Sequence, residues 1–461
     1  MIHYFQNNGY NIALDAPSGA VHILSDVAYA ILEHIAPPLD KKCPEQLYSS
    51  LSGASRNEIE EAYSDLYELY EDETLFSPDW DEKPELREYA AASKIVKSLC
   101  LHISHDCNMR CSYCFAGTGS YEHRRSLMSF ETGKRAIDFL LEQSGPIKNL
   151  ELDFFGGEPL LNFDVVKKLV EYGREAEKVK KKNIRFTITT NGTLLDDDAI
   201  AFINENMSNA VLSVDGRKCV NDSVRFYEDG SGTYDDILPK YKKLIESRTS
   251  DWYVRGTYTQ KNKDFAADVL HLADAGFENI SVEPVVLDAD DPLALSEYDI
   301  PALCAEYDRL AAEMIRRNEN GEGFAFFHFM IDLDAGPCVY KRVKGCGSGS
   351  EYIAVTPDGD LYPCHQFAGY PEYKMGNLYE KTFDKNIQSK FAGCNIMSME
   401  HCKNCWAKYY CGGGCAANSY KFNKKLDGQY NLACILEKKR IECAMSIKAA
   451  GSERCGGAAT F

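Results

Sequence analysis

The sequence has no long hydrophobic run and too few basic residues to balance its acidic ones. Its 461 residues include 51 Lys and Arg against 70 Asp and Glu, which gives a net charge of −19. This acidic excess argues against nucleic acid and anionic membrane surfaces as main partners. No apolar run reaches the roughly 18 residues that a membrane span needs, and no apolar segment follows a basic start. We therefore expect a soluble cytoplasmic protein.

Cysteine, in contrast, is abundant, with 18 residues in the chain. Disulfides are rare in cytosolic proteins, so metal or cluster ligation is the better explanation for so many thiols. Several oxygen-sensitive clusters would point to an anaerobic bacterium as the source. The chain is too long for one ordinary domain, and we expect two or three.

Strand-like and helix-like segments alternate between residues 96 and 320. Alternation of this kind predicts a parallel sheet with helices outside it, and six units are too few for a complete eightfold barrel. We therefore expect an α/β fold built on a partial (β/α)6 barrel, with its chemistry at the carboxyl ends of the strands. The expected strands are 99–104, 150–155, 184–190, 210–214, 253–259 and 279–286, and helices are expected at 129–143 and 165–179.

Residues 1–80 are expected to form a separate small module. Two strands, 10–15 and 20–24, flank a turn, and helices are expected at 27–35 and 56–70. This pattern is typical of a winged-helix-like unit. An exposed strand edge there could pair with an extended peptide, and a plain packing extension is the equally open alternative. Residues 81–95 are expected to be a linker.

Three cysteines within eight residues, Cys107, Cys111 and Cys114, follow the first strand of the expected barrel. Three thiolates on a cubane cluster leave its fourth iron open, and an open iron can bind a substrate or cofactor. The alternative is a zinc knuckle whose fourth ligand is His105 or His123.

This spacing resembles the CxxxCxΦC motif of radical S-adenosylmethionine (SAM) enzymes, with Tyr113 as the aromatic residue. In that family the open iron chelates the methionine moiety of SAM, and one electron from the cluster cleaves SAM to a 5′-deoxyadenosyl radical. The resemblance implies that the three cysteines are the catalytic cluster ligands. It also implies a partial barrel and SAM as a cofactor.

A second motif, Gly156-Gly157-Glu158-Pro159, follows the second expected strand. Glycines let the backbone approach a ligand closely, and Glu158 can accept hydrogen bonds from an ammonium group. The motif resembles the GGEP sequence that contacts the amino group of SAM in the same family.

Further cofactor contacts are implied at the ends of the third and fourth strands. The resemblance assigns Thr189, Asn191 and Ser213 to hydrogen bonds with the ribose and carboxylate of SAM, and Arg225 could pair with a carboxylate. The alternatives are that Asn191 belongs to a simple turn and that Arg225 is a solvated surface residue.

Nine cysteines lie between residues 338 and 434. From residue type alone, two zinc sites of four cysteines each fit as well as clusters do. Their spacing resembles the SPASM domain, expected over residues 321–450, which holds auxiliary iron–sulfur clusters. The resemblance implies a distal cluster on Cys402, Cys405, Cys411 and Cys434 and a nearer one on Cys346, Cys364 and Cys415. Either Cys338 closes the near cluster or one iron stays open, so three 4Fe–4S clusters are expected in total. Residues 451–461 are expected to be a tail.

The whole chain is most similar to the six-cysteines-in-forty-five-residues (SCIFF) maturases, through residues 15–19 and 345–366. That resemblance implies an oxidoreductase that forms thioether bridges in a ribosomal precursor peptide. Residues 1–80 would bind the leader of that peptide, and a flavodoxin or ferredoxin would donate electrons. The alternatives are an anaerobic sulfatase maturase, which would not need residues 1–80, a carbon–carbon crosslinking enzyme, and a zinc-rich scaffold protein.

Overall fold

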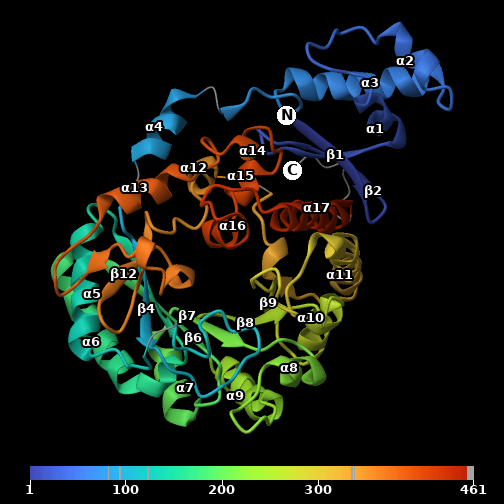
Figure 1. The fold of residues 1–461 in the computed structure, drawn as a ribbon. Coiled ribbons are helices and arrows are strands. Elements are labelled where there is room, and N and C mark those ends of the chain that lie inside the picture. Colours follow the sequence, from blue (N-terminus) through green and yellow to red (C-terminus); the bar gives the residue numbers. More distant parts are fainter. Residues whose placement is uncertain (81–82, 93–94, 122–123, 334–335, 337, 454–461) are drawn as a thin grey trace.

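The computed structural model describes residues 1–80, 83–92, 95–121, 124–333, 336 and 338–453, so His123 and the end of the expected tail lie outside it. Its strands form a three-stranded antiparallel sheet and a ten-stranded sheet (Figure 1). No helix in these ranges combines the length and the apolar character that crossing a membrane requires.

The six expected barrel strands are all present, and they lie side by side in chain order with parallel pairing. They are β4 (Ser98–Ser104), β5 (Asn149–Gly156), β6 (Asn183–Thr190), β7 (Asn209–Ser213), β8 (Asp251–Tyr258) and β9 (Asn279–Pro284). The carboxyl ends of these strands therefore meet at one edge of the sheet, which is where the predicted motifs lie. The mixed α/β fold with a large parallel sheet is confirmed.

Strands outside the predicted range extend this sheet at both edges. β10 (Ala325–Phe326) pairs with β9, and β11 (Tyr352–Val355) pairs in parallel with β4. β12 (Asp360–Tyr362) and β13 (Gly376–Asn377) then continue it in antiparallel fashion. The second cysteine-rich region is thus joined to the first strand of the barrel, which a local sequence pattern does not reveal.

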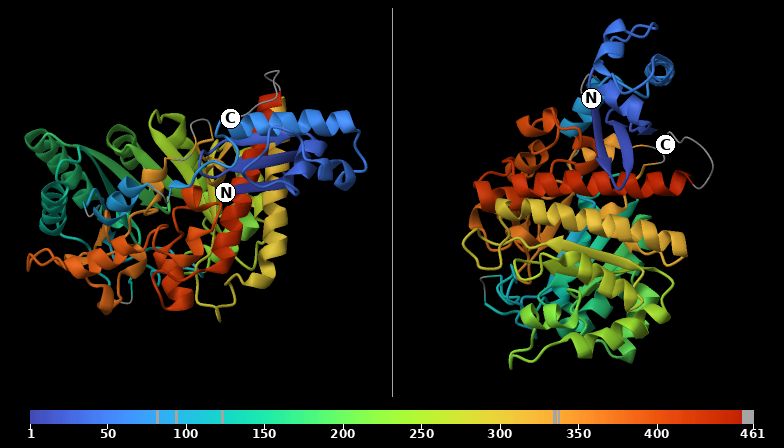
Figure 2. Two further views of the ribbon diagram at one scale, coloured as in Figure 1. Left: turned by 90° about the horizontal axis from the view of Figure 1, so that it is seen from above. Right: turned by 90° about the vertical axis from the view of Figure 1, so that its right-hand side faces the viewer.

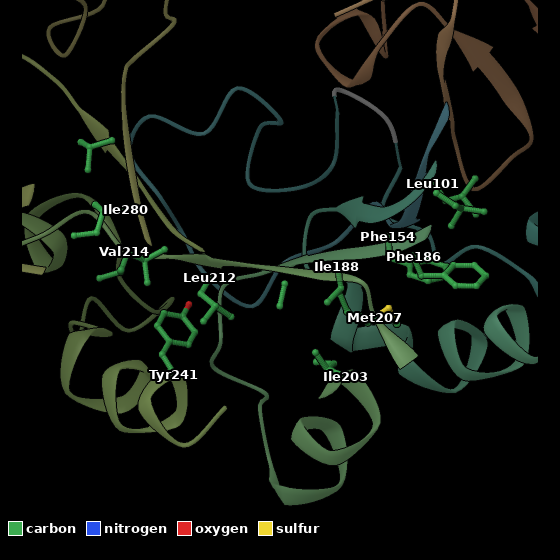
Figure 3. Packing of buried hydrophobic residues seen from close by; sticks show 14 of the residues in the cluster. Leu101, Phe154, Phe186, Ile188, Ile203, Met207, Leu212, Val214, Tyr241 and Ile280 are labelled. Carbon is green, nitrogen blue, oxygen red and sulfur yellow. The ribbon is translucent and has the colours of Figure 1, made fainter. Parts of the chain in front are cut away.

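Helices cover the outer face of the parallel sheet (Figure 1). Both predicted helices are present as α5 and α6, and the Ser129 hydroxyl caps α5 by accepting the Thr132 N–H at 3.0 Å. Leu152 and Phe154 of β5 are buried against the helices, and Figure 3 shows Phe154, Phe186 and Met207 in this layer. Alternate residues of β5 consequently face the concave side. The helices are α5 (Phe130–Gln143), α6 (Phe163–Lys180), α7 (Asp197–Asn206), α8 (Lys218–Val224), α9 (Tyr234–Glu246), α10 (Phe265–Asp274) and α11 (Ile300–Asn320).

The N-terminal region contains the strands and helices that the sequence predicts, with β1 and α2 in addition. Its elements are β1 (Ile2–Asn7), β2 (Tyr10–Asp15), β3 (Val21–Leu24), α1 (Asp26–Leu32), α2 (Glu45–Ser50) and α3 (Arg56–Glu71). β1 pairs with β2, and β2 pairs with β3, so β3 is an edge strand. Ser55 and Glu58 form a capping box at the start of α3.

The cysteine-rich C-terminal region consists of short helices above the concave side of the sheet, followed by one long helix (Figure 1). That long helix, α17, packs along α11 and also touches β1 and β2 (Figure 2). The expected linker contains a helix, α4, whose Leu86 is buried against Val343 and Tyr409. The helices are α4 (Pro84–Ala92), α12 (Val339–Arg342), α13 (Lys385–Gly393), α14 (Glu400–Lys403), α15 (Lys408–Cys411), α16 (Ala416–Asn423) and α17 (Asn431–Glu453).

Candidate active site at the carboxyl ends of the strands

The structure brings Cys107, Cys111 and Cys114 together in the loop after β4. The loop is held from outside, because the Arg110 N–H donates to the Phe226 carbonyl oxygen at 2.8 Å. Burial, with repulsion among the three cysteines as a lesser cause, raises the pKa of Cys107 to about 11 and that of Cys111 to about 12. At neutral pH these groups stay thiols unless a metal displaces their protons, so iron binding would have to supply the compensating charge.

The two glycines after β5 lie directly against this cysteine loop. A Cβ atom on Gly156 would lie 2.3 Å from the Ser104 carbonyl oxygen, and one on Gly157 would lie 2.1 Å from the Asp106 carbonyl oxygen. The Gly157 N–H donates to Ser104 at 2.7 Å, and the Glu158 N–H donates to Asp106 at 2.9 Å. The close approach that the motif predicts is therefore made to the cysteine loop of the chain itself.

Glu158 is fully buried, and its carboxylate joins the ends of β5 and β6. One oxygen accepts the Thr190 hydroxyl at 2.8 Å and the Leu160 N–H at 3.0 Å, and the other accepts the Asn191 N–H at 2.7 Å. Burial raises the pKa of Glu158 to about 7, although these donors oppose the shift. Pro159, also buried, opens the short helical turn that follows.

The predicted residues at the ends of β6 and β7 lie beside the cysteine loop or line a cavity next to it. Asn191 forms a turn, because its Oδ1 accepts the Thr193 N–H at 3.0 Å, and its Nδ2 also lies 3.6 Å from the Cys107 Sγ. The turn at Asn191 is therefore present, and its contact with SAM stays a prediction. Thr189 and Ser213 line a cavity of about 190 Å³ together with Arg225. Arg225 is only 6% exposed, so the alternative of a solvated surface arginine is wrong.

Two charged residues that the sequence analysis missed complete the wall of this cavity. Arg255 within β8 and Glu283 near the end of β9 form an ion pair at 2.6 Å. Burial alone would raise the pKa of Glu283, but Arg255 and His328 lower it to about 2. Glu283 is therefore a permanent carboxylate. Scanning the interior of each predicted strand for charged residues could have found both.

The C-terminal cysteines fall into the two predicted groups. Neighbouring thiols within each group raise one another's pKa, which links Cys346, Cys364 and Cys415 in one and Cys402, Cys405, Cys411 and Cys434 in the other. A second cavity of about 530 Å³ is lined by cysteines of both groups and by Glu283. Since Glu283 also lines the first cavity, the two cavities adjoin at this residue.

Cys338 is exposed, as are Cys346 and Cys415 of the near group. The thiols that raise the pKa of Cys364 are Cys415 and Cys346. The role of Cys338 as a fourth ligand of the near cluster stays a prediction.

Across the ranges that the structure describes, no group of three or more His, Cys, Asp or Glu side chains is arranged to hold a single metal ion.

Two family models match the chain. One, the radical SAM superfamily, matches residues 101–288, and the other, the iron–sulfur cluster-binding SPASM domain, matches residues 346–406. The first covers the three-cysteine loop and all the strand ends described above. The second covers Cys346, Cys364, Cys402 and Cys405.

Similar proteins support the same assignment. The cysteine-type anaerobic sulfatase-maturating enzyme of Clostridium novyi is 26% identical over 342 residues, which is 70% of this chain and 89% of that protein. The solved structure of native anSMEcpe with bound AdoMet is 22% identical, with a TM-score of 0.63, and covers 77% of this chain and 99% of its own.

A second solved structure resembles more of the chain. Streptococcus suis SuiB bound to its precursor peptide SuiA is 17% identical, with a TM-score of 0.54, and covers 94% of this chain and 98% of its own. Residues 81–461 make up less than 94% of the chain, so the part that is similar in fold to SuiB extends into the N-terminal region.

Proposed function

We propose that this chain, an enzyme that joins a radical SAM domain to an iron–sulfur SPASM domain, forms thioether bridges in a cysteine-rich ribosomal precursor peptide. The observation that carries the proposal is the meeting of the two cavities at Glu283. A peptide there would reach the cysteine loop on one side and the near auxiliary cysteines on the other. The reaction joins a cysteine sulfur to a carbon and removes two hydrogen atoms per bridge.

Each group of residues has a separate task in this proposal. Bound SAM and three 4Fe–4S clusters supply the radical chemistry and accept the surplus electron. The loop cysteines would hold the first cluster, and the two C-terminal groups would hold the auxiliary clusters. Gly156, Gly157 and Glu158 fix the loop in place, while Thr189, Ser213 and Arg225 line the cavity that would receive SAM.

The N-terminal region is proposed to be the winged-helix-like element that binds the leader of the precursor. The β1 side of its sheet is attached to the body of the protein, since His3 stacks on Trp406 at 3.8 Å and bonds Glu442 at 3.0 Å. β3, at the opposite edge, pairs with β2 alone in the described chain. An extended leader adding to β3 would gain backbone hydrogen bonds there. The electron donor is proposed to be a flavodoxin or ferredoxin.

Mass spectrometry of an anaerobic reaction tests the proposed chemistry. The reaction contains reconstituted enzyme, reductant, SAM and a cysteine-rich precursor peptide encoded beside the gene. The expected product has lost two hydrogen atoms per bridge, and the bridged cysteines resist alkylation. The same mass loss with every cysteine still alkylated would replace the thioether with a carbon–carbon crosslink. Replacing Cys107, Cys111 and Cys114 together by Ala should abolish cleavage of SAM in the same assay.

Hydrogen exchange tests the proposed leader site without altering the protein. Leader peptide added to the full chain should slow exchange of the amides of β3, with little change in the exposed face of α11 as an internal control. Protection confined to other segments would reject docking at β3. Deleting residues 1–80 should then weaken peptide binding yet leave uncoupled cleavage of SAM.

A second candidate is the formation of formylglycine on a partner protein. The observation in its favour is the 70% share of this chain that matches the Clostridium novyi sulfatase-maturating enzyme. The two chemistries differ in their product, because formylglycine formation removes the cysteine sulfur, whereas a thioether keeps it. Aldehyde-specific labelling of the product peptide distinguishes them.

A further inference from the structure

Tyr113 and Arg225 line the smaller cavity and form one hydrogen-bonded unit with Asp215 behind them. The Tyr113 hydroxyl donates to the Asp215 Oδ2 at 2.7 Å and accepts from the Arg225 Nη1 at 3.1 Å. Asp215 is completely buried, and its other oxygen accepts the Thr257 N–H at 3.0 Å. The phenol hydroxyl therefore links a fixed carboxylate on one side to a guanidinium on the other.

Arg225 has a hydrogen-bond donor that this unit leaves unpaired. Its Nε is buried and has no hydrogen-bond partner among the described residues. Leaving a buried, charged donor unpaired is costly, so a native structure normally explains it by a ligand or another bound group. Since Arg225 also lines the cavity, the missing acceptor would come from a molecule bound there.

The surroundings hold the guanidinium in one orientation. Arg225 donates to the Tyr113 hydroxyl, which donates in turn to Asp215, and Asp215 is itself held by the Thr257 N–H. A planar guanidinium held in one orientation suits the recognition of a carboxylate.

We propose that Tyr113 and Asp215 are positioning residues that orient Arg225 to bind the carboxylate of the methionine moiety of SAM. Tyr113 occupies the aromatic position between the second and third loop cysteines, and its hydroxyl couples this loop to Arg225 at the end of α8. The inference rests on the proposed use of SAM and not on the fate of the peptide.

The test is equilibrium binding of SAM to the reconstituted full-length enzyme in the absence of peptide. Tyr113→Phe should raise the Kd for SAM roughly tenfold, equivalent to about 1.4 kcal/mol, with iron content unchanged. Decarboxylated SAM, which lacks the carboxylate, is the matched probe, and its Kd should change by less than about twofold. Tyr258→Phe is the control variant. It also removes a buried tyrosine hydroxyl, which lies on β8 and forms a hydrogen bond of 3.0 Å with the Tyr307 hydroxyl.

A double-mutant cycle shows whether Tyr113 acts through Arg225. In an Arg225→Gln background, Tyr113→Phe should weaken SAM binding no further, because the side chain that it orients is already gone. Three results would each overturn the proposal. Tyr113→Phe could weaken the binding of SAM and of decarboxylated SAM equally, or its loss of SAM affinity could add to that of Arg225→Gln in the double variant. It could also change the Kd for SAM as little as Tyr258→Phe does. Loss of iron from Tyr113→Phe would also overturn it, since the hydroxyl would then hold the cluster loop instead. The experiment contains no peptide, so failure of thioether formation leaves its outcome unaffected.

Discussion

Gly157→Ala should detach the cysteine loop from its support at the end of β5. The new Cβ would lie 2.1 Å from the Asp106 carbonyl oxygen and 2.6 Å from its carbonyl carbon. These are backbone atoms one residue before Cys107, so the loop has to move by about 1 Å to restore an ordinary contact. Overpacking of this kind costs about 1–3 kcal/mol. The bonds that Ser104 and Asp106 accept at 2.7 and 2.9 Å add about 1 kcal/mol each if they break.

The expected total is about 1–5 kcal/mol of unfolding free energy, with the upper end reached if both bonds break, together with loss of iron from the first cluster. Chemical denaturation and iron analysis after anaerobic reconstitution measure the two effects. Gly393→Ala is the matched control, because a Cβ there meets no atom within 4 Å. If Gly157→Ala has the stability and iron content of Gly393→Ala, the motif does not support the loop, and this explanation of its glycines is wrong.

Three further predictions test other parts of the structure. Cys364→Ser should lower the iron content from about twelve atoms per chain to about eight, and it should impair bridge formation more than SAM cleavage. Cys338→Ser should keep all the iron. Equal iron loss in both variants would make Cys338 a cluster ligand. Burial raises the pKa of Asp153 to about 7, so the folded protein keeps a proton that the unfolded chain releases, and stability falls as pH rises from about 4 to 7. In Asp153→Asn the loss of stability between pH 4 and 7 should be smaller by up to about 4 kcal/mol. If the unfolding free energies of variant and wild type depend equally on pH, the raised pKa of Asp153 is wrong. Ile441→Ala, at the buried contact between α17 and the N-terminal sheet, should cost about 2–4 kcal/mol of unfolding free energy, whereas Val179→Ala, at a 79% exposed position, should stay within about 0.5 kcal/mol.

The alternation of strands and helices could be predicted because its signals are local. Phe186 and Ile188 alternate with polar residues along β6, and Ser129 supplies an N-cap where α5 begins. The short strands β10 and β13 have only two residues each, too few to show a period. They form because a neighbouring strand edge is already present, which is a property of the assembled sheet.

The site was predictable only in part, for a similar reason. Cysteine spacing predicted the three-cysteine loop, because thiols of one loop are necessarily close in space. The division of the C-terminal cysteines into two groups came instead from the resemblance to the SPASM domain, since Cys411 and Cys415 are neighbours in sequence yet belong to different groups. The roles of Arg255, Glu283 and Asp215 were missed, since each depends on a partner from another strand or loop. Arg225 looked like a surface residue because nothing near it in sequence shows that Tyr113 and Asp215 enclose it.

The sequence by itself determined the order of elements, the cysteine groups and the chemistry to which those groups are suited. Only the tertiary structure decided that β11 lies beside β4, which brings the Cys364 region to the mouth of the barrel. It also decided that Glu283 borders both cavities and that Arg225 is buried with an unpaired donor. The physical reason is that periodicity and capping act over a few residues. Strand pairing, burial and the pKa of a buried group depend instead on contacts between residues far apart in the chain.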